Sequence, residues 1–198
     1  MPPCFGAHGG NTMNDTATAS NAITYFHNNR PAQTFLAALK SLATQPREFF
    51  AGAPFAVFYG NSLFFASIII FILTFLAVPS YSLGMLFMLP VTWGSILIGM
   101  YMLAAYMSWG VKAFTGVRLT PANAFQLSAY AFAPMMFVGL SWAGLAAFLY
   151  SMYLLWLGLT AHCRIAGARA VLVLVVPVLI VAMIGGAMMF ALGHLKIS

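Results

Sequence analysis

The sequence predicts an all-α, polytopic membrane protein: a bundle of five transmembrane helices preceded by a short amino-terminal interfacial helix. Of its 198 residues, 63% are hydrophobic and 5% are charged, whereas a soluble domain is about half apolar and about one quarter charged. Residues 55–78 contain no charged side chain. A run of that length is enough to cross about 30 Å of hydrocarbon at about 1.5 Å per residue.

Residues 1–29 are predicted to form a disordered polar tail. They are rich in Asn, Thr, Ala and Gly and lack the apolar core of a secretory signal peptide. Within this tail Cys4 and His8 offer two metal ligands with no further ligand nearby, which is too few for a metal centre. Cys163 is the other cysteine of the chain, so no disulfide framework is expected.

Residues 30–50 are predicted to form an amphipathic helix at the membrane surface. Phe35, Leu39 and Leu42 recur at the three- and four-residue spacing of one helical face. Pro46 ends this helix, because proline cannot donate a backbone hydrogen bond.

Charge-free runs define a membrane domain, which is predicted to cover residues 51–193 and to be followed by a short tail at 194–198. Pro79 begins a turn after the first span, and Trp109 marks the far boundary of the second. The run 122–161 has no charge and is too long for one ordinary span, but long enough for two. The predicted spans are about 55–78, 83–109, 123–140, 143–161 and 170–192.

The positions of the basic residues favour five spans over four. With five spans, seven basic residues fall on the same side as the amino terminus, and Lys196 alone falls on the other. With four spans, Arg164 and Arg169 would move to the outer side and weaken this bias. Because basic residues gather in cytoplasmic loops, we expect a cytoplasmic amino terminus and a carboxy terminus outside. The seven basic residues are Arg30, Lys40, Arg47, Lys112, Arg118, Arg164 and Arg169.

Several short motifs follow one another in a fixed order between about Leu36 and Leu192. In this order the chain resembles the Yip domain family, the Ypt/Rab-interacting proteins of the early secretory pathway and their small prokaryotic relatives. The motifs are Pro46-x-x-Phe49-Phe50, Thr115-Gly116, Ala129-Tyr130-Ala131 with Pro134, Tyr150-x-x-Tyr153-Leu154-Leu155-x-x-Gly158-Leu159, His162 and Arg169-Ala170.

The resemblance implies a five-span bundle with a cytoplasmic amino-terminal region. For eukaryotic members it implies roles in vesicle trafficking and membrane shaping through small GTPases and partner Yip proteins. This chain has a short amino-terminal tail that is nearly free of acidic residues. It therefore looks more like the small prokaryotic members, whose biochemical role is unassigned, and a prokaryotic inner membrane is its expected location.

The sequence offers few candidates for catalytic residues. The two acidic residues, Asp15 and Glu48, lie outside the predicted spans, so no intramembrane carboxylate is available for a proton relay or a coupling cation. Ser141 and His194 are the candidates for nucleophilic catalysis, but Ser141 falls in a predicted turn where serine is common for backbone reasons. We therefore expect a non-enzymatic protein without catalytic residues, cofactor or metal.

Four basic residues offer a possible contact with anionic lipid headgroups or an acidic partner: Lys112, Arg118, Arg164 and Arg169. Their main expected role is to set the membrane topology. Each is also expected to contribute about 1 kcal/mol of binding free energy at an anionic membrane surface. His162, at a predicted helix end, is expected to hydrogen-bond unsatisfied carbonyl groups. Eight basic residues spread along the chain do not form the clustered footprint of a nucleic-acid-binding protein.

Small residues recur at four-residue spacing in the predicted fourth span, at Ala143, Ala147 and Ser151. Such spacing lets helix backbones approach closely in lipid. Packing within the bundle is the favoured interpretation, and a homodimer interface is the alternative.

Two functions remain open. The favoured one is a scaffold or adaptor in membrane organisation or trafficking, which contacts membrane or partner proteins through its cytoplasmic basic face. The alternative is a small transporter or permease subunit for a neutral or apolar solute, with a midplane cavity lined by polar groups such as Asn123, Gln126 or Tyr153. In that case the helices would be broken at Pro90, Pro134 and Pro177.

Overall fold

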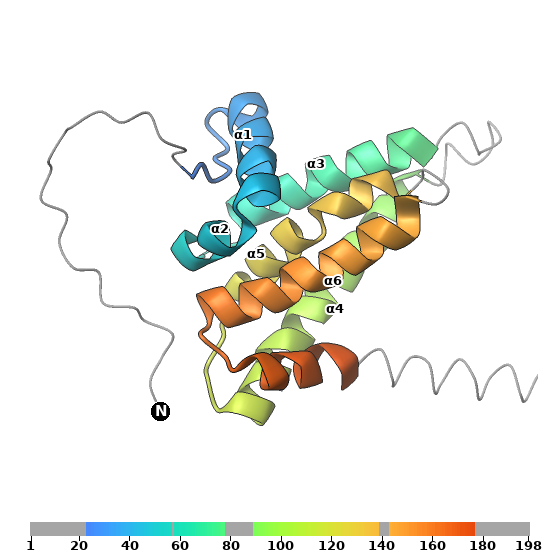
Figure 1. Cartoon of the computed structure of the whole chain (residues 1–198). Coiled ribbons are helices and arrows are strands. Elements are labelled where there is room, and N and C mark those ends of the chain that lie inside the picture. Colours follow the sequence, from blue (N-terminus) through green and yellow to red (C-terminus); the bar gives the residue numbers. More distant parts are fainter. Residues whose placement is uncertain (1–22, 57, 78–88, 139–142, 177–198) are drawn as a thin grey trace, which may run out of the picture.

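The computed structural model describes residues 23–56, 58–77, 89–138 and 143–176, and their regular secondary structure is helical (Figure 1). The all-α prediction is confirmed for this part of the chain. In chain order the helices are α1 (Pro31–Thr44), α2 (Pro46–Gly52), α3 (Gly60–Ala77), α4 (Leu89–Thr115), α5 (Pro121–Ala131), the 3-10 helix η3 (Ala133–Phe137), α6 (Ala143–His162) and a further helix, Gly167–Val176.

Two of the described helices, α4 and α6, are long and apolar enough to cross a membrane. The apolar helices at α3 and Gly167–Val176 are shorter. Large apolar side chains lie exposed on the bundle, among them Phe71 and Phe75 on α3 and Met102 on α4, and lipid is the solvent that tolerates such a surface. The structure therefore supports a membrane protein, while the count of five spans stays a prediction.

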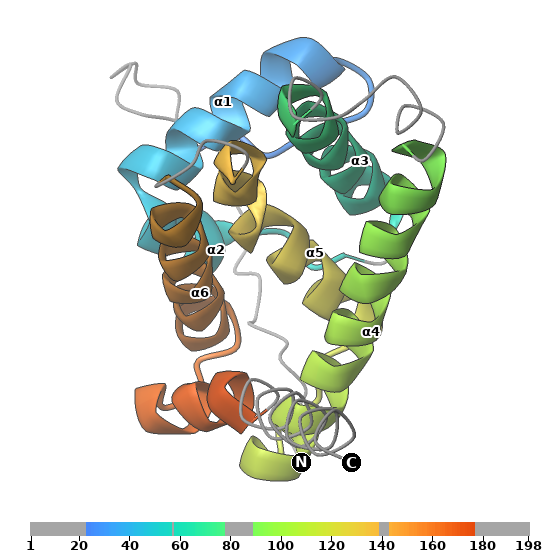
Figure 2. The same ribbon diagram turned by 90° about the vertical axis from the view of Figure 1, so that its right-hand side faces the viewer.

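The central helix of the bundle is α5. Each of its residues from Ala122 to Ala131 is buried, and α3, α4 and α6 pack around it (Figure 2). The Thr120 hydroxyl oxygen caps its first turn by accepting a hydrogen bond from the Asn123 backbone N at 3.3 Å. Pro121 occupies the first helical position, where no intrahelical N–H donor is needed.

The predicted span 123–140 is not one continuous helix, which corrects the sequence-based expectation. The α-helix ends at Ala131, Phe132 caps it, and the chain continues as the 3-10 helix η3. Pro134 explains the break, because it has no N–H to donate to the carbonyl of Tyr130 and its ring would clash with that carbonyl.

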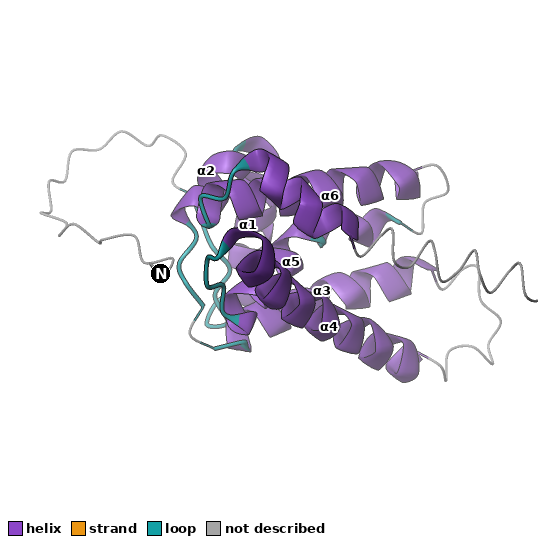
Figure 3. Ribbon diagram, turned by 90° about the horizontal axis from the view of Figure 1, so that it is seen from below, coloured by secondary structure: helices purple, strands orange, loops and turns teal. Residues whose placement is uncertain are grey.

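Consecutive helices of the bundle run in alternating directions (Figures 1 and 3). The end of α3 and the beginning of α4 lie at the right of Figure 1, and α6 runs back from that side to the left. As a result, α2, the end of α4 and the end of α6 share one end of the bundle. This is the end where the predicted topology collects the basic loops.

The interfacial segment predicted at 30–50 forms two helices. Pro46 begins α2 immediately after the Gln45 cap that ends α1, as expected from the missing N–H of proline. The helix that was expected to end near Trp109 continues through the buried Gly110 to Thr115, and it ends at Gly116, whose φ is +73°.

Several sequence predictions lie outside the described residues. They concern the tail residues Cys4 and His8, the turn at Ser141, and His194 and Lys196 near the carboxy terminus.

Candidate functional site

Five motif residues come together where α2 packs against α5 and α6; we call them the α2 junction. Phe49 and Phe50, the two junction residues on α2, are fully buried, although α2 has only 7 residues. A helix of that length is not stable by itself, so these two rings anchor it to the bundle. The junction consists of Phe49, Phe50, Tyr130, Gly158 and His162.

Phe49 is the centre of an aromatic cluster. Its ring meets Tyr130 edge to face, with centroids 5.0 Å apart, a geometry that contributes about 0.5–1.5 kcal/mol beyond burial. Its backbone carbonyl accepts a hydrogen bond of 3.1 Å from the hydroxyl of Tyr25. Burial raises the pKa of the Tyr25 phenol. The chain before α1 is thereby held against α2.

His162, the last residue of α6, connects that helix to α2. Its Nδ1 lies 3.2 Å from the carbonyl oxygen of Phe50, and because a carbonyl can only accept, Nδ1 carries the hydrogen. Nε2 is buried without a hydrogen-bond partner among the described residues, and the Phe55 ring lies against the imidazole with centroids 4.5 Å apart. The expected carbonyl partner therefore belongs to another helix and not to α6 itself.

Gly158 lies one turn before His162, on the same face of α6. A Cβ atom at this position would lie 3.3 Å from Phe50 Cδ1 and 3.4 Å from Leu127 Cδ2. These separations are shorter than normal carbon contacts of about 3.5–4.0 Å. Glycine is thus what allows α2 and α5 to approach α6 this closely.

Two other motif residues face outward. Tyr150 and Tyr153 are exposed on α6 and form an aromatic ladder with Trp156. Ring centroids are 6.0 Å apart from Tyr150 to Tyr153 and 6.1 Å from Tyr153 to Trp156. The ladder follows the three-residue spacing of one helical face and leads toward the end of α6 that holds the junction.

Four basic residues lie in or beside two loops at that same end of the bundle; we call this set the basic end. Lys112 lies in the last turn of α4, Arg118 in the loop that follows, and Arg164 and Arg169 lie just after α6. All four side chains are exposed. The buried polar residues of the described chain carry no formal charge, so its charges are confined to the surface.

Both loops of the basic end begin with a residue in the left-handed region. Gly116 follows α4 with a φ of +73°, and Arg164 follows α6 with a φ of +52°. Glycine adopts this conformation without strain, whereas an arginine does so at a cost.

A groove of about 430 Å³ lies between α2 and the end of α6. The exposed side chain of Arg47 forms one side, and the ladder residues Tyr153 and Trp156 form another. The Trp156 indole Nε1 donates a hydrogen bond of 3.2 Å to the carbonyl of Gly167, which holds the ring in place. The remaining lining residues are Leu157, Thr160, Ala161, Ile165 and Gly167 itself.

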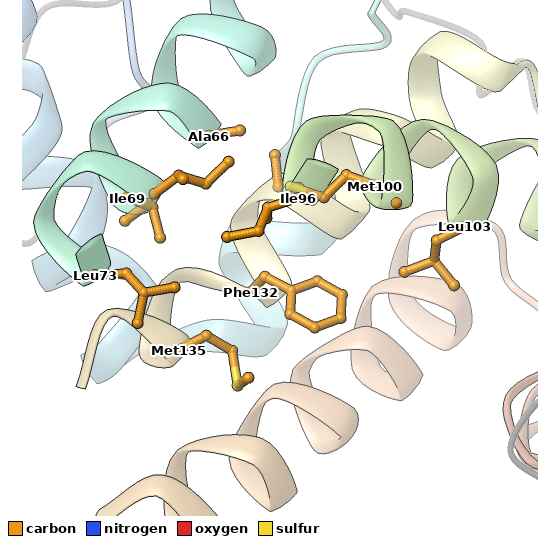
Figure 4. A pocket seen from close by; sticks show the side chains of 11 residues that line it. Ala66, Ile69, Leu73, Ile96, Met100, Leu103, Phe132 and Met135 are labelled. Atoms are coloured by element: carbon orange, nitrogen blue, oxygen red, sulfur yellow. The ribbon is translucent and has the colours of Figure 1, made fainter. Parts of the chain in front are cut away.

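A second cavity, of about 310 Å³, lies between α3, α4 and the α5–η3 segment (Figure 4). The lining residues within the described ranges are apolar and include Ile69 of α3, Met100 of α4 and Phe132. The polar residues proposed for a transporter cavity do not line it: Asn123 accepts a hydrogen bond from the Ala56 backbone N, and Tyr153 lines the groove. Within the described ranges, no cluster of three or more His, Cys, Asp or Glu side chains could hold a metal ion.

Comparison with known families identifies the family of this chain. The model of the Yip1 domain matches residues 39–189, a range that contains the whole α2 junction and the basic end. The chain belongs to the Yip1 domain family. No curated protein and no solved structure matches the chain. Membership in the Yip1 family, together with two span-like helices, indicates a membrane-associated protein related to trafficking.

Two groups of motif residues of this Yip1 domain are separate in space. Five of them meet at the α2 junction, and the two exposed tyrosines build the ladder with Trp156. Arg47 was counted among the basic residues that set the topology, and the structure shows that it lines the groove. Its position two residues before Phe49 is the signal that was available, since residues i and i+2 point to opposite sides of a helix.

Proposed function

We propose that this Yip1 domain protein is a non-enzymatic scaffold or adaptor that organises membrane or partner proteins through its basic end. The observation that carries this proposal is the separation of charge. Buried polar residues in the described chain are uncharged, while Lys112, Arg118, Arg164 and Arg169 are exposed at one end of the bundle. Such an arrangement suits recognition at a surface better than chemistry in an interior.

The proposed topology places the basic end in the cytoplasm, with five spans in a prokaryotic inner membrane. Exposed basic residues on the amino-terminal side of the bundle support it, because cytoplasmic loops collect Lys and Arg. There the basic end faces anionic headgroups, which contribute about 1 kcal/mol per basic residue. The proposed partners are these lipids together with an acidic membrane protein or a second copy of the chain.

Affinity purification from native membranes tests the adaptor function. The tagged full-length protein is compared with a variant that neutralises the basic end, with glutamine at positions 112, 118 and 169 and asparagine at 164. Asparagine tolerates the left-handed backbone of residue 164. A matched control neutralises Arg30 and Lys40, which are exposed before and on α1.

We expect mass spectrometry to find a recurrent partner with the unmodified protein and with the control, and to lose it with the basic-end variant. Retention of the partner by the basic-end variant would exclude this surface as the binding site. Absence of any recurrent partner in repeated purifications would count against an adaptor.

A second candidate function, passage of an apolar solute, is favoured by the apolar cavity in Figure 4. Gly99 lines this cavity, and a Cβ atom there meets no atom within 4 Å. The substitution Gly99→Leu would fill the cavity without disturbing the basic end. A permease is expected to lose solute uptake in this variant, whereas an adaptor keeps its partner.

A further inference from the structure

We propose that the groove between α2 and α6 is a binding site for the headgroup of an anionic phospholipid, with Arg47 contacting the phosphate. The proposal rests on the proposed function in one respect, namely that this end of the bundle meets the anionic leaflet. It adds a specific ligand class and a phosphate contact, Arg47, that is not one of the basic-end residues.

The hydrogen-bond donors of the groove determine what it can bind. The Trp156 indole donates to Gly167, and the Thr160 hydroxyl donates to the backbone carbonyls of Trp156 and Leu157 at 3.0 and 3.1 Å. Among the side chains that line the groove, the donors left for a ligand are the Arg47 guanidinium and the Tyr153 hydroxyl. A guanidinium matches two oxygens of a phosphate in a bidentate manner, so the groove suits an anion with several oxygens.

Arg47 is free of an acidic competitor in the described chain. Glu48 is the single acidic residue within the described ranges, and no ion pair joins it to Arg47. Neighbouring residues on a helix point about 100° apart, so Glu48 is directed away from the groove that Arg47 lines. Arg164 and Arg169 lie next to the lining residues Ile165 and Gly167 and add positive potential at its edge.

The apolar part of the groove distinguishes a lipid from a soluble phosphate ester. Leu157 and Ile165 are nearly fully buried in its wall, and Trp156 presents a ring to it. The ladder of Tyr150, Tyr153 and Trp156 continues from the groove along the exposed face of α6. Tyrosine and tryptophan are enriched where membrane meets water, because their rings are apolar and their tips are polar.

The size of the groove fits a headgroup with its glycerol. Its volume of about 430 Å³ lies in the lower part of the range of small-molecule sites, about 300–1,000 Å³. The acyl chains would then leave the groove along the ladder and remain in the bilayer. Phosphatidylglycerol has the matching chemistry: one negative phosphate, a polar headgroup and two acyl chains.

Native mass spectrometry of the full-length protein in detergent tests this site. Dioleoylphosphatidylglycerol and dioleoylphosphatidylcholine are titrated separately, and the dissociation constant of the first bound lipid is measured. We expect tighter binding of phosphatidylglycerol. We expect Arg47→Gln to weaken it about fivefold, as for the loss of one basic contact to an anionic headgroup, with a smaller effect on phosphatidylcholine, whose phosphate charge is balanced by its choline cation.

Two further variants separate the groove from general surface charge. Tyr153→Phe keeps the aromatic ladder and removes one hydroxyl donor, so about threefold weaker binding of phosphatidylglycerol is expected. Lys40→Gln removes an exposed charge from α1 that does not line the groove, and its affinity should match that of the unmodified protein. Circular dichroism of each variant verifies that the helices are retained.

Glycerol 3-phosphate at millimolar concentration distinguishes the two sources of the phosphate. We expect it not to displace phosphatidylglycerol, because it lacks the acyl chains. Displacement as effective as by the lipid itself would overturn the lipid assignment.

Equal affinity of Arg47→Gln and the unmodified protein for phosphatidylglycerol would also overturn the proposal. If the basic-end variant loses the lipid in that case, the groove proposal fails while the proposed function stands. If Arg47→Gln loses the lipid but still captures the partner protein, the groove is a site of its own.

Discussion

Replacing Gly158 by alanine tests whether close packing of three helices holds the α2 junction together. The added methyl group would lie 3.3 Å from Phe50 Cδ1 and 3.4 Å from Leu127 Cδ2. Neither neighbour can move easily: both are buried, and the carbonyl of Phe50 also accepts a hydrogen bond from His162. Overpacking of this kind costs about 1–3 kcal/mol.

Gly99→Ala is the matched control for this substitution. Gly99 is also a helical glycine, and a Cβ atom there meets nothing within 4 Å. Both substitutions gain about 1 kcal/mol of helix propensity, so this gain cancels in the comparison. The difference in stability between the two variants therefore equals the overpacking cost of about 1–3 kcal/mol.

Thermal unfolding in detergent measures this difference. Cys163 is 5% exposed, so in a Cys4→Ser background a thiol-reactive fluorescent dye reports the opening of the bundle near the end of α6. We expect Gly158→Ala to unfold roughly 2–12 °C below Gly99→Ala. Equal unfolding temperatures would show that Phe50 and Leu127 yield to the methyl group and would refute the packing argument.

Three further predictions concern the loops, the amino-terminal segment and the topology. Gly116→Ala should destabilise the protein by about 1–2 kcal/mol because residue 116 has a positive φ. Arg164→Gly should stabilise it by about 0.5–1 kcal/mol by relieving the same backbone strain. The dye assay should therefore show a lower unfolding temperature for the first variant and a higher one for the second. Tyr25→Phe should cost about 0.5–1.5 kcal/mol through the lost hydrogen bond to Phe49. Burial raises the Tyr25 pKa, so the folded state favours the protonated phenol. The contribution of Tyr25 to stability is therefore complete below about pH 10 and is lost as the pH rises further. When unfolding is measured from about pH 8 to 11, Tyr25→Phe should lose less stability at alkaline pH than the unmodified protein. A single cysteine at position 80 should react with a membrane-impermeant maleimide from outside the cell, and modification from the cytoplasm alone would contradict the five-span topology.

The helical class of the fold was predictable because it depends on composition and on uninterrupted apolar runs. The bounds of α6, Ala143–His162, agree closely with the predicted span 143–161, since a polar loop follows it. The break between α5 and η3 was harder to predict. A proline near one end of an apolar run can either begin a helix or interrupt one, and the burial of α5 on all sides removes the periodicity that would separate these cases.

The candidate site was predictable only in part. Phe49, Tyr130 and Gly158 were recognisable as motif residues, but their mutual contact depends on how α2, α5 and α6 cross, which no local pattern specifies. Arg47 was recognisable as a charge. Its place in the groove follows only once Phe50 is known to pack against α6, because Arg47 lies three residues before Phe50 and thus on the same side of α2.

The position of Arg47 on α2 links the buried junction to the surface groove and leads to a last prediction. Arg47 belongs to a helix of 7 residues that the bundle holds through Phe49 and Phe50, and Gly158 sets how close that helix lies to α6. Gly158→Ala should therefore weaken phosphatidylglycerol binding, although Gly158 does not line the groove, because a displaced α2 carries Arg47 away from Tyr153. Gly99→Ala should leave lipid binding unchanged. If Gly158→Ala stays folded at the temperature of the measurement and binds the lipid as tightly as Gly99→Ala, the junction does not position Arg47, and the guanidinium finds the phosphate through the flexibility of its own side chain.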